Sequence, residues 1–132
     1  MSIEYTDCLD GIMPGMLKGF FQGWKKPHSP DSHLQILHQS QYVVLALDAA
    51  ENKVVGFVTA LTDGTQAAFI PLLEVLPAYQ RQGIGTELMR RILTKLKGIP
   101  AIDVTCDPHL QTFYARFGMQ PLVGMVIRDY GS

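Results

Sequence analysis

Residues 72–96 read LLEVLPAYQRQGIGTELMRRILTKL, and this stretch contains a strand, a polar loop with two glycines and an amphipathic helix. The apolar run before Pro77 is typical of a buried strand. From Ile84 to Leu96, apolar residues recur at helical spacing, basic residues occupy the opposite face, and Gly98 ends the pattern. A helix N-terminus presents unpaired N–H groups and a partial positive charge, which suit a phosphate group. The stretch therefore predicts a phosphate-binding site.

Two common phosphate-binding motifs compete for this loop. A dinucleotide fingerprint requires a third glycine, and Leu88 stands at that position. Asp103 lies at a suitable distance along the chain for a ribose contact, but only one strand–helix pair follows the loop, and a dinucleotide fold needs more. A P-loop requires Gly-Lys-Ser/Thr, which the loop lacks. Both motifs fit the sequence poorly.

Turn signals divide the rest of the chain into alternating elements. Apolar spacing predicts a helix from about Pro14 to Trp24, a second from Pro30 to about Gln39 after Ser29 as N-cap, and a last helix from Leu110 to Phe117. The predicted strands are Ile3–Thr6, Tyr42–Leu47, Val54–Leu61, Ala67–Leu76, Ala101–Cys106 and Leu122–Arg128. The order β-α-α-β-β-β-α-β-α-β predicts an α/β (α+β) fold, a mixed sheet with helices on both faces.

Pro71 falls inside one of these predicted strands, the run from Ala67 to Leu76. Proline has no N–H and cannot donate to a strand ladder. We therefore expect Pro71 to lie where the ladder needs no donor.

The composition favours one soluble domain over residues 1–132. The chain has 47% hydrophobic and 17% charged residues and a net charge of −1, so the balance indicates neither nucleic acid nor an anionic membrane as partner. No apolar run reaches the roughly 20 residues of a membrane span, and the start of the sequence does not resemble a signal peptide. Two cysteines without metal-ligand spacing predict a reduced, cytoplasmic protein.

The stretch LEVLPAYQRQGIGTEL, residues 73–88, resembles motif A of the GNAT acetyltransferase superfamily, whose signature is Gln/Arg-x-x-Gly-x-Gly/Ala. Gln80, Gly83 and Gly85 fill the three defined positions. Downstream, FYARFGM over residues 113–119 resembles the family's Phe/Leu-Tyr-x-x-x-Gly-Phe segment. The three antiparallel runs upstream also match, so the resemblance covers nearly the whole chain.

The resemblance implies a central splayed sheet that binds acetyl-CoA and no metal. In the family, the strand corresponding to residues 72–76 carries a bulge and diverges from the strand at residues 101–106. The pantetheine arm enters this opening and pairs with backbone groups, here those of Leu73 and Val75. The pyrophosphate would lie on the backbone amides of Gln80, Arg81, Gln82, Gly83, Ile84, Gly85 and Thr86.

The implied reaction is direct attack of a substrate amine on the thioester. The N–H of Leu73 would stabilise the developing negative charge. Tyr114 matches the family's tyrosine and would protonate the departing thiolate, whose thiol has a pKa of roughly 8.5. Glu74, the only carboxylate on the diverging strand, is the candidate base, either through a water or by orienting the substrate. The glutamate base of some histone-acetylating relatives corresponds here to Phe69, so that mechanism does not transfer. Asp107 replaces an asparagine that contacts the cofactor arm in many members.

The four histidines share no metal-ligand spacing, and we expect them on the surface. His28 and His33 lie on the connection that lines the acceptor groove in the family, so a substrate contact is the alternative for these two.

Three functional interpretations remain. The first is an N-acetyltransferase that acetylates a small-molecule or peptide amine, and the second is a catalytically silent acyl-CoA-binding regulatory domain. A toxin-type acetyltransferase acting on aminoacyl-tRNA is the third, but the sequence lacks an obvious basic groove. One predicted strand follows Gly118 where many relatives have two, so an open sheet edge is available to a second subunit and a homodimer is possible.

Overall fold

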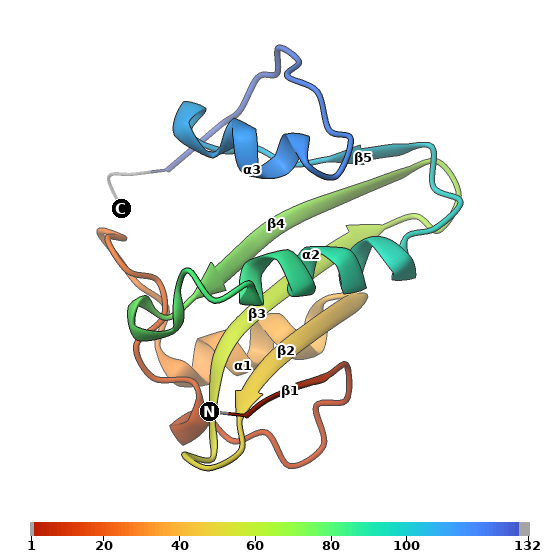
Figure 1. Ribbon diagram of the computed structural model, residues 1–132. Coiled ribbons are helices and arrows are strands. Elements are labelled where there is room, and N and C mark those ends of the chain that lie inside the picture. Colours follow the sequence, from red (N-terminus) through yellow and green to blue (C-terminus); the bar gives the residue numbers. More distant parts are fainter. Residues whose placement is uncertain (1, 130–132) are drawn as a thin grey trace.

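The computed structural model describes residues 2–129 (Figure 1). Single 3₁₀ turns at Pro14–Met16, Pro77–Tyr79 and Pro108–Leu110 accompany the regular elements. Those elements are β1 (Ile3–Thr6), α1 (Pro30–Gln39), β2 (Tyr42–Asp48), β3 (Lys53–Thr62), β4 (Ala67–Val75), α2 (Ile84–Lys95), β5 (Ala101–Asp103) and α3 (Gln111–Ala115). No helix among residues 2–129 is both long and apolar enough to cross a lipid bilayer.

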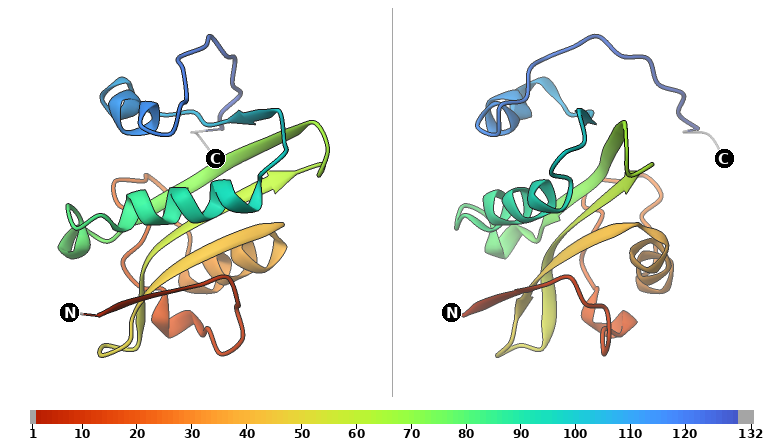
Figure 2. Two further views of the ribbon diagram at one scale, coloured as in Figure 1. Left: turned by 45° about the vertical axis from the view of Figure 1, so that its right-hand side comes forward. Right: turned by 90° about the vertical axis from the view of Figure 1, so that its right-hand side faces the viewer.

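The sheet has five strands in the order β1-β2-β3-β4-β5. The first four pair antiparallel, and β5 runs parallel to β4. Helices α1 and α2 cover opposite faces, and α3 lies beyond β4, next to β5 (Figures 1 and 2). The mixed α/β architecture predicted from the sequence is confirmed.

The central strand β3 and the helix α2 carry apolar residues on the faces that pack in the core. Residues 54–60 of β3 are almost fully buried, which a continuous apolar run allows for a strand covered on both faces. Helix α2 buries Ile84, Leu88, Met89 and Ile92 against the sheet. Gly56 permits this close approach, because a Cβ there would lie 3.1 Å from Leu88 Cδ1. Helix α1 begins as predicted, with Ser29 Oγ accepting a hydrogen bond from the Ser32 N–H at 3.1 Å.

A bulge interrupts the ladder between β3 and β4. Thr59 pairs with Leu72 and Leu61 with Phe69, so Ile70 and Pro71 together oppose Ala60. Pro71 therefore lies where the register shifts, as its missing N–H requires. The family resemblance implied a bulge within residues 72–76. That position is wrong, because the observed bulge lies at Ile70 and Pro71, immediately before Leu72.

Strands β4 and β5 diverge after three paired residues each. The parallel register runs from Ala67 opposite Ala101 to Phe69 opposite Asp103 and then ends. The predicted strand over residues 101–106 is therefore too long. The remaining part of β4, residues 70–75, faces an opening on the side from which β5 has departed.

The helix predicted from about Pro14 to Trp24 is wrong. Only a 3₁₀ turn forms, because Gly19, Phe21 and Gly23 adopt positive φ angles of 94°, 64° and 80°, which a right-handed helix cannot contain. Part of the apolar stripe nevertheless belongs to the core: Leu17, Phe20 and Phe21 are buried, whereas Met13 and Trp24 are 62% and 48% exposed. Hydrophobic spacing therefore predicted the burial of the first three residues correctly, but not the burial of Met13 and Trp24 or the helical conformation.

The C-terminal part also departs from the sequence-based expectation. Helix α3 is shorter than the predicted Leu110–Phe117 and follows the 3₁₀ turn at Pro108–Leu110; Gly118 follows with φ 85°. The strand predicted at Leu122–Arg128 is wrong, since these residues pair with no strand in the described part of the chain.

Candidate active site

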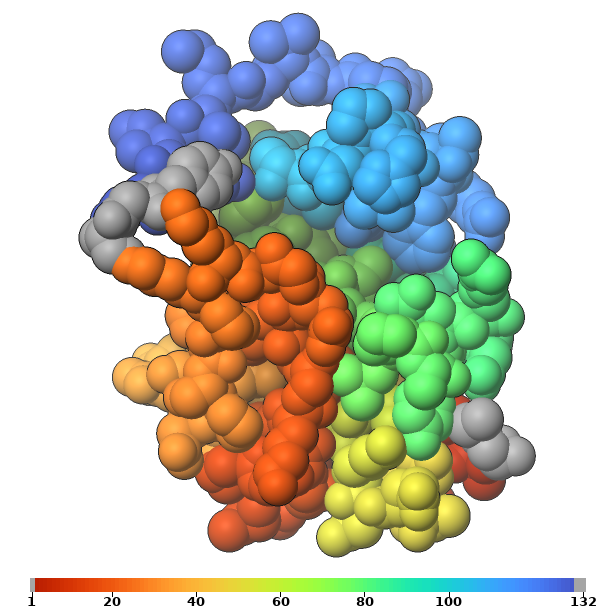
Figure 3. Space-filling model, turned by 90° about the vertical axis from the view of Figure 1, so that its left-hand side faces the viewer, coloured from red at the N-terminus to blue at the C-terminus, as the bar shows by residue number. Residues whose placement is uncertain are grey.

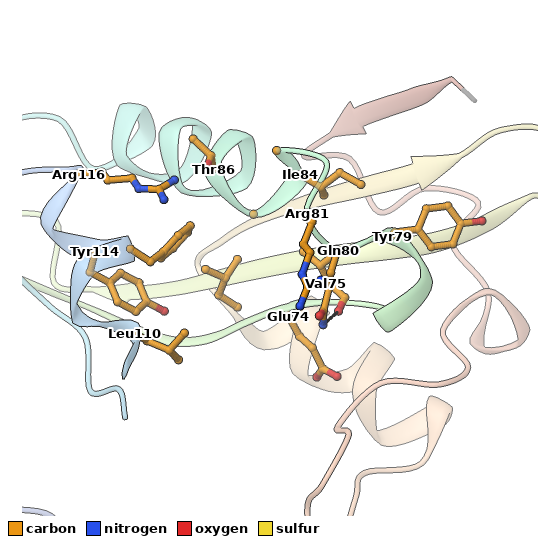
Figure 4. A pocket seen from close by; sticks show the side chains of 14 residues that line it. Glu74, Val75, Tyr79, Gln80, Arg81, Ile84, Thr86, Leu110, Tyr114 and Arg116 are labelled. Atoms are coloured by element: carbon orange, nitrogen blue, oxygen red, sulfur yellow. Dashed lines mark hydrogen bonds between the residues drawn. The ribbon is translucent and has the colours of Figure 1, made fainter. Parts of the chain in front are cut away.

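An open cavity of about 560 Å³ lies where β4, the loop before α2 and helix α3 meet (Figure 4). On the space-filling surface, the N-terminal segment (orange), the loop before α2 (green) and the residues around α3 (blue) surround this face (Figure 3). The lining residues are Leu73, Glu74, Val75, Tyr79, Gln80, Arg81, Gly83, Ile84, Gly85, Thr86, Leu110, Phe113, Tyr114 and Arg116. The cavity thus contains every site residue predicted from the sequence except Gln82, which is exposed on the loop outside it.

The backbone of β4 presents polar groups to this cavity. The Leu76 N–H donates to the Val55 carbonyl at 2.8 Å, so the backbone polar groups of Leu76 point toward β3. Backbone direction alternates along a strand, and the N–H and C=O of Leu73 and Val75 therefore point to the side that β5 has left. The side-chain amide of Gln80 confirms this direction, since it donates to the Val75 carbonyl at 3.0 Å. This edge can pair with an extended amide-containing chain.

The N-terminus of α2 forms the second polar element of the cavity. Gly83, with φ 85°, is the N-cap and offers no side chain, and the first intrahelical hydrogen bond runs from the Glu87 N–H to the Gly83 carbonyl at 3.0 Å. The preceding amides, including those of Gly85 and Thr86, have no partner within the helix. Arg81 also has a positive φ, 64°, so the loop turns sharply enough to expose these N–H groups. Such a concave group of amides binds anions.

Two arginines add positive charge around the cavity. Arg81 extends from the loop before α2, and Arg116 extends from the end of α3 toward α2 (Figure 4). Arg116 also lies 6.0 Å from the centre of the Phe113 ring. Arg116 was not predicted from the sequence, where the available signal was a cation two residues after Tyr114, at the C-cap of the same short helix.

Tyr114 supplies a protonated hydroxyl to the cavity wall. Its side chain is buried, with 9% exposed, and packs edge-on against Phe113 at 5.0 Å between ring centres. Burial, with a smaller contribution from the nearby Cys106, raises the pKa of Tyr114 above its usual 10. A neutral phenol at this place can donate a proton to a departing anion.

Glu74 points to the face of the sheet opposite α2. Its carboxylate accepts hydrogen bonds from the Phe21 N–H at 2.8 Å and the Gln22 N–H at 3.2 Å. These bonds hold the N-terminal segment, including the positive-φ residue Phe21, against β4. Glu74 therefore anchors one wall of the opening.

Replacing Glu74 by Ala should lower the free energy of unfolding by about 2 kcal/mol, because two hydrogen bonds to a charged acceptor are lost. Glu74→Gln keeps one acceptor oxygen and should recover roughly half of that loss. Urea unfolding of both variants measures the difference. Equal stability of Glu74→Ala and the unmodified chain would contradict the anchoring role.

His33 corrects the expectation that the histidines lie on the surface. Its side chain is 1% exposed, neither ring nitrogen has a hydrogen-bond partner, and its ring lies 4.3 Å from that of Phe57 and 4.9 Å from that of Phe21. Burial, with a minor contribution from His28, lowers the pKa of His33 to about 4. His28 itself is exposed and packs against Phe21 at 5.1 Å between ring centres.

The depressed pKa of His33 predicts acid sensitivity. In the unfolded chain the imidazole binds a proton below pH 6.5, whereas the folded protein resists protonation until about pH 4. The free energy of unfolding should therefore fall as pH drops from 6.5 to 4, by about 2–3 kcal/mol. Urea unfolding at pH 7 and pH 5 measures this slope. The variant His33→Phe should lose most of it, and an unchanged slope in that variant would assign the acid sensitivity to other groups.

No group of three or more His, Cys, Asp or Glu side chains among residues 2–129 is arranged to hold a metal ion. The polar groups that line the cavity include backbone amides, the Tyr114 phenol, the Glu74 carboxylate and the guanidinium groups of Arg81 and Arg116.

This architecture and the sequence are both similar to those of known proteins. A family model described as "Acetyltransferase (GNAT) family" matches residues 10–119. The uncharacterised N-acetyltransferase ycf52 of Gracilaria tenuistipitata var. liui is 30% identical over 101 residues, which are 73% of this chain and 54% of that protein. The chain thus spans about half the length of this curated relative.

Two solved structures are similar to this protein over almost its full chain. A protein from Deinococcus radiodurans R1, assigned as an acetyltransferase, has 41% identity and a TM-score of 0.93 over 97% of this chain and 89% of its own. The GNAT family protein SP0256 from Streptococcus pneumoniae TIGR4 has 27% identity and a TM-score of 0.72, with 98% of each chain covered.

Proposed function

Because this chain belongs to the GNAT acetyltransferase family, we propose that residues 1–132 form one N-acetyltransferase domain that transfers an acetyl group from acetyl-CoA to an amine. One observation carries the proposal: the outward-facing backbone of β4, the unpaired amides of α2 and the Tyr114 hydroxyl line the same cavity. The cytoplasmic location stays a prediction.

The residues of the cavity fit acetyl-CoA. Leu73 and Val75 offer backbone groups to the amides of the pantetheine arm, although the Val75 carbonyl already accepts from Gln80. The pyrophosphate is assigned to the amides of the loop before α2, and Arg81 and Arg116 balance its charge. The loop residues assigned to this contact are Gln80, Arg81, Gln82, Gly83, Ile84, Gly85 and Thr86. Bound acetyl-CoA supplies the thioester whose carbonyl carbon the amine attacks.

In the proposed reaction the amine forms a bond to the thioester carbon and the carbon–sulfur bond breaks. The Leu73 N–H donates to the carbonyl oxygen as negative charge develops there. Tyr114 gives its proton to the departing sulfur. The proton lost by the amine passes to solvent, with Glu74 as the candidate acceptor through a water molecule.

The acceptor is proposed as a small-molecule or peptide amine. It would approach from the side of the sheet where the N-terminal segment lies, since α2 and α3 flank the other side (Figures 1 and 4). A carboxylate on that side, Glu74, attracts a cationic amine before it loses its proton.

Thermal unfolding with acetyl-CoA, CoA and NAD tests the ligand assignment. A ligand at about 100 times its Kd adds roughly 2.7 kcal/mol to the free energy of unfolding, which raises the Tm by on the order of 10 °C. We expect both CoA compounds to raise the Tm and NAD to leave it unchanged. A response to NAD alone, or to none of the three, would refute the acetyl-CoA site.

A further inference from the structure

The segment before α2, residues 77–83, has one buried side chain. Tyr79 is 7% exposed, whereas the other residues of the segment are exposed to solvent. The phenol of Tyr79 donates to the Asp48 carboxylate, with 2.7 Å between Tyr79 Oη and Asp48 Oδ2. In the described part of the chain, no other hydrogen bond joins residues 77–83 to β2 or β3. The position of this exposed segment relative to the sheet therefore depends on one side chain.

Asp48 is a buried carboxylate at the end of β2, 4% exposed. Its Oδ1 accepts hydrogen bonds from the N–H groups of Ala50 and Glu51, at 3.1 and 3.3 Å, in the connection between β2 and β3. Its Oδ2 accepts from Tyr79. A carboxylate removed from water is costly unless hydrogen bonds satisfy its oxygens. Asp48 therefore joins two loops, the β2–β3 connection and the segment before α2.

The Tyr79–Asp48 pair keeps its charge state at neutral pH. The hydrogen bond, together with burial, raises the pKa of Tyr79 to about 12. The same bond, helped by those from Glu51 and Ala50, lowers the pKa of Asp48. Lys53 Nζ also lies 5.2 Å from the centre of the Tyr79 ring. The phenol thus stays a donor, and the carboxylate stays an acceptor.

The loop that follows Tyr79 has an unfavourable backbone conformation. Arg81 has φ 64° and Gly83 has φ 85°. A non-glycine residue remains at such a φ only where the surrounding structure holds it. Gln80 holds the loop to β4 through its side-chain bond to Val75, and Tyr79 holds it to the β2–β3 connection. Figure 4 shows the Tyr79 side chain directed away from Arg81, so the hydroxyl anchors the loop from outside.

We propose that the Tyr79–Asp48 hydrogen bond holds residues 80–83 in the arrangement that binds the phosphate groups of acetyl-CoA. Tyr79 is a positioning residue, because its hydroxyl is bonded to Asp48 and acts on the ligand through the amides of the loop. The inference rests on the proposed function, since acetyl-CoA supplies the phosphates. The pantetheine arm is assigned instead to backbone groups of β4, which the sheet holds without Tyr79. Loss of the hydrogen bond should therefore weaken only ligands that carry phosphate.

NMR titration of the full chain with CoA, pantetheine and inorganic pyrophosphate tests the proposal. Tyr79→Phe removes only the hydroxyl. We expect it to raise the Kd for CoA and for pyrophosphate about tenfold, as for a loop that adopts its binding arrangement a tenth as often. The Kd for pantetheine should change by less than about twofold. Tyr42→Phe is the matched control, since Tyr42 lies on β2 outside the cavity lining and should change none of the three.

Asp48→Asn separates the hydrogen bond from the charge. The amide oxygen keeps the bonds from Ala50 and Glu51, and the amide nitrogen donates to the Tyr79 oxygen. We therefore expect the Kd for CoA to stay within about threefold of that of the unmodified chain. Circular dichroism verifies that both variants are folded at the temperature of the titrations.

Three results would overturn the positioning role of Tyr79. They are an unchanged CoA affinity in Tyr79→Phe, equal losses of affinity for CoA and pantetheine, and a loss in Asp48→Asn as large as in Tyr79→Phe. If the unmodified chain binds pyrophosphate but not CoA, the proposed function fails, and the pyrophosphate titrations of the variants still decide the role of Tyr79. If the unmodified chain binds neither compound, both proposals fail.

Discussion

Replacing Tyr114 by Phe should lower kcat for acetyl transfer by about 10²- to 10³-fold and leave the KM for acetyl-CoA nearly unchanged. The substitution removes only the hydroxyl, and the ring still packs against Phe113. Below the thiol pKa of roughly 8.5 the departing sulfur takes up a proton, so the loss of its proposed donor, the Tyr114 hydroxyl, should slow the chemical step. The measurement is thiol release under saturating acetyl-CoA and amine.

Tyr42→Phe is the matched control for this prediction. Tyr42 lies on β2, 36% exposed and outside the cavity lining, and its change to Phe should leave kcat unaltered. If Tyr114→Phe keeps kcat within about threefold of the unmodified chain, general-acid catalysis by Tyr114 is excluded, because such catalysis contributes at least about 10²-fold.

Replacing Gly85 by a larger residue should weaken CoA binding, and Gly85→Ala should also raise the free energy of unfolding of the ligand-free protein. A Cβ at position 85 would meet Phe113 Cζ at 3.7 Å and Val75 Cγ2 at 3.9 Å, both ordinary contacts, so an Ala side chain fits at this position. Ala in place of a helical Gly adds up to about 1 kcal/mol to the free energy of unfolding. The same methyl group narrows the passage between β4 and α3 to which we assign the pantetheine arm in the proposed complex.

We expect Gly85→Ala to raise the Kd for CoA by about tenfold and Gly85→Val by at least about 100-fold, as overpacking of this size costs about 1–3 kcal/mol. Titration calorimetry gives the Kd, and urea unfolding gives the stability. Gly15→Ala is the control, since a Cβ there meets nothing within 4 Å and position 15 is not part of the cavity lining. Unchanged CoA binding in Gly85→Val would place the cofactor elsewhere.

The central strands and α2 were predictable because their apolar patterns determine both conformation and burial. The observed bounds of β2 and β3 differ from the predicted ones by one residue at most, and α2 forms within the stretch whose apolar pattern predicted a helix. Pro71 indicated where the ladder is interrupted, and the glycines of the loop indicated where α2 begins. The same patterns brought together almost the whole candidate site, because the contacts are made by backbone groups whose places follow from the strand and helix ends.

The failures have physical causes in particular residues. In the N-terminal segment, Gly15, Gly19 and Gly23 recur every four residues, and two of them take positive φ, so a helical spacing of core residues occurs without a helix. His33 precedes the buried Leu37 by four residues on α1, which was the available signal for its burial. The strand at residues 122–128 was assigned from composition alone, and composition does not specify the pairing partner.

The most direct test of acetyl transfer is to incubate the protein with isotope-labelled acetyl-CoA and a panel of small-molecule and peptide amines. Mass spectrometry follows the label, and a thiol reagent follows free CoA. The account predicts that at least one amine acquires the label in equal amount to the CoA released, at a rate that Tyr114→Phe reduces by about 10² or more. If the protein binds acetyl-CoA but releases thiol no faster than buffer with every amine, it is a silent acyl-CoA-binding domain, which contradicts the proposed activity.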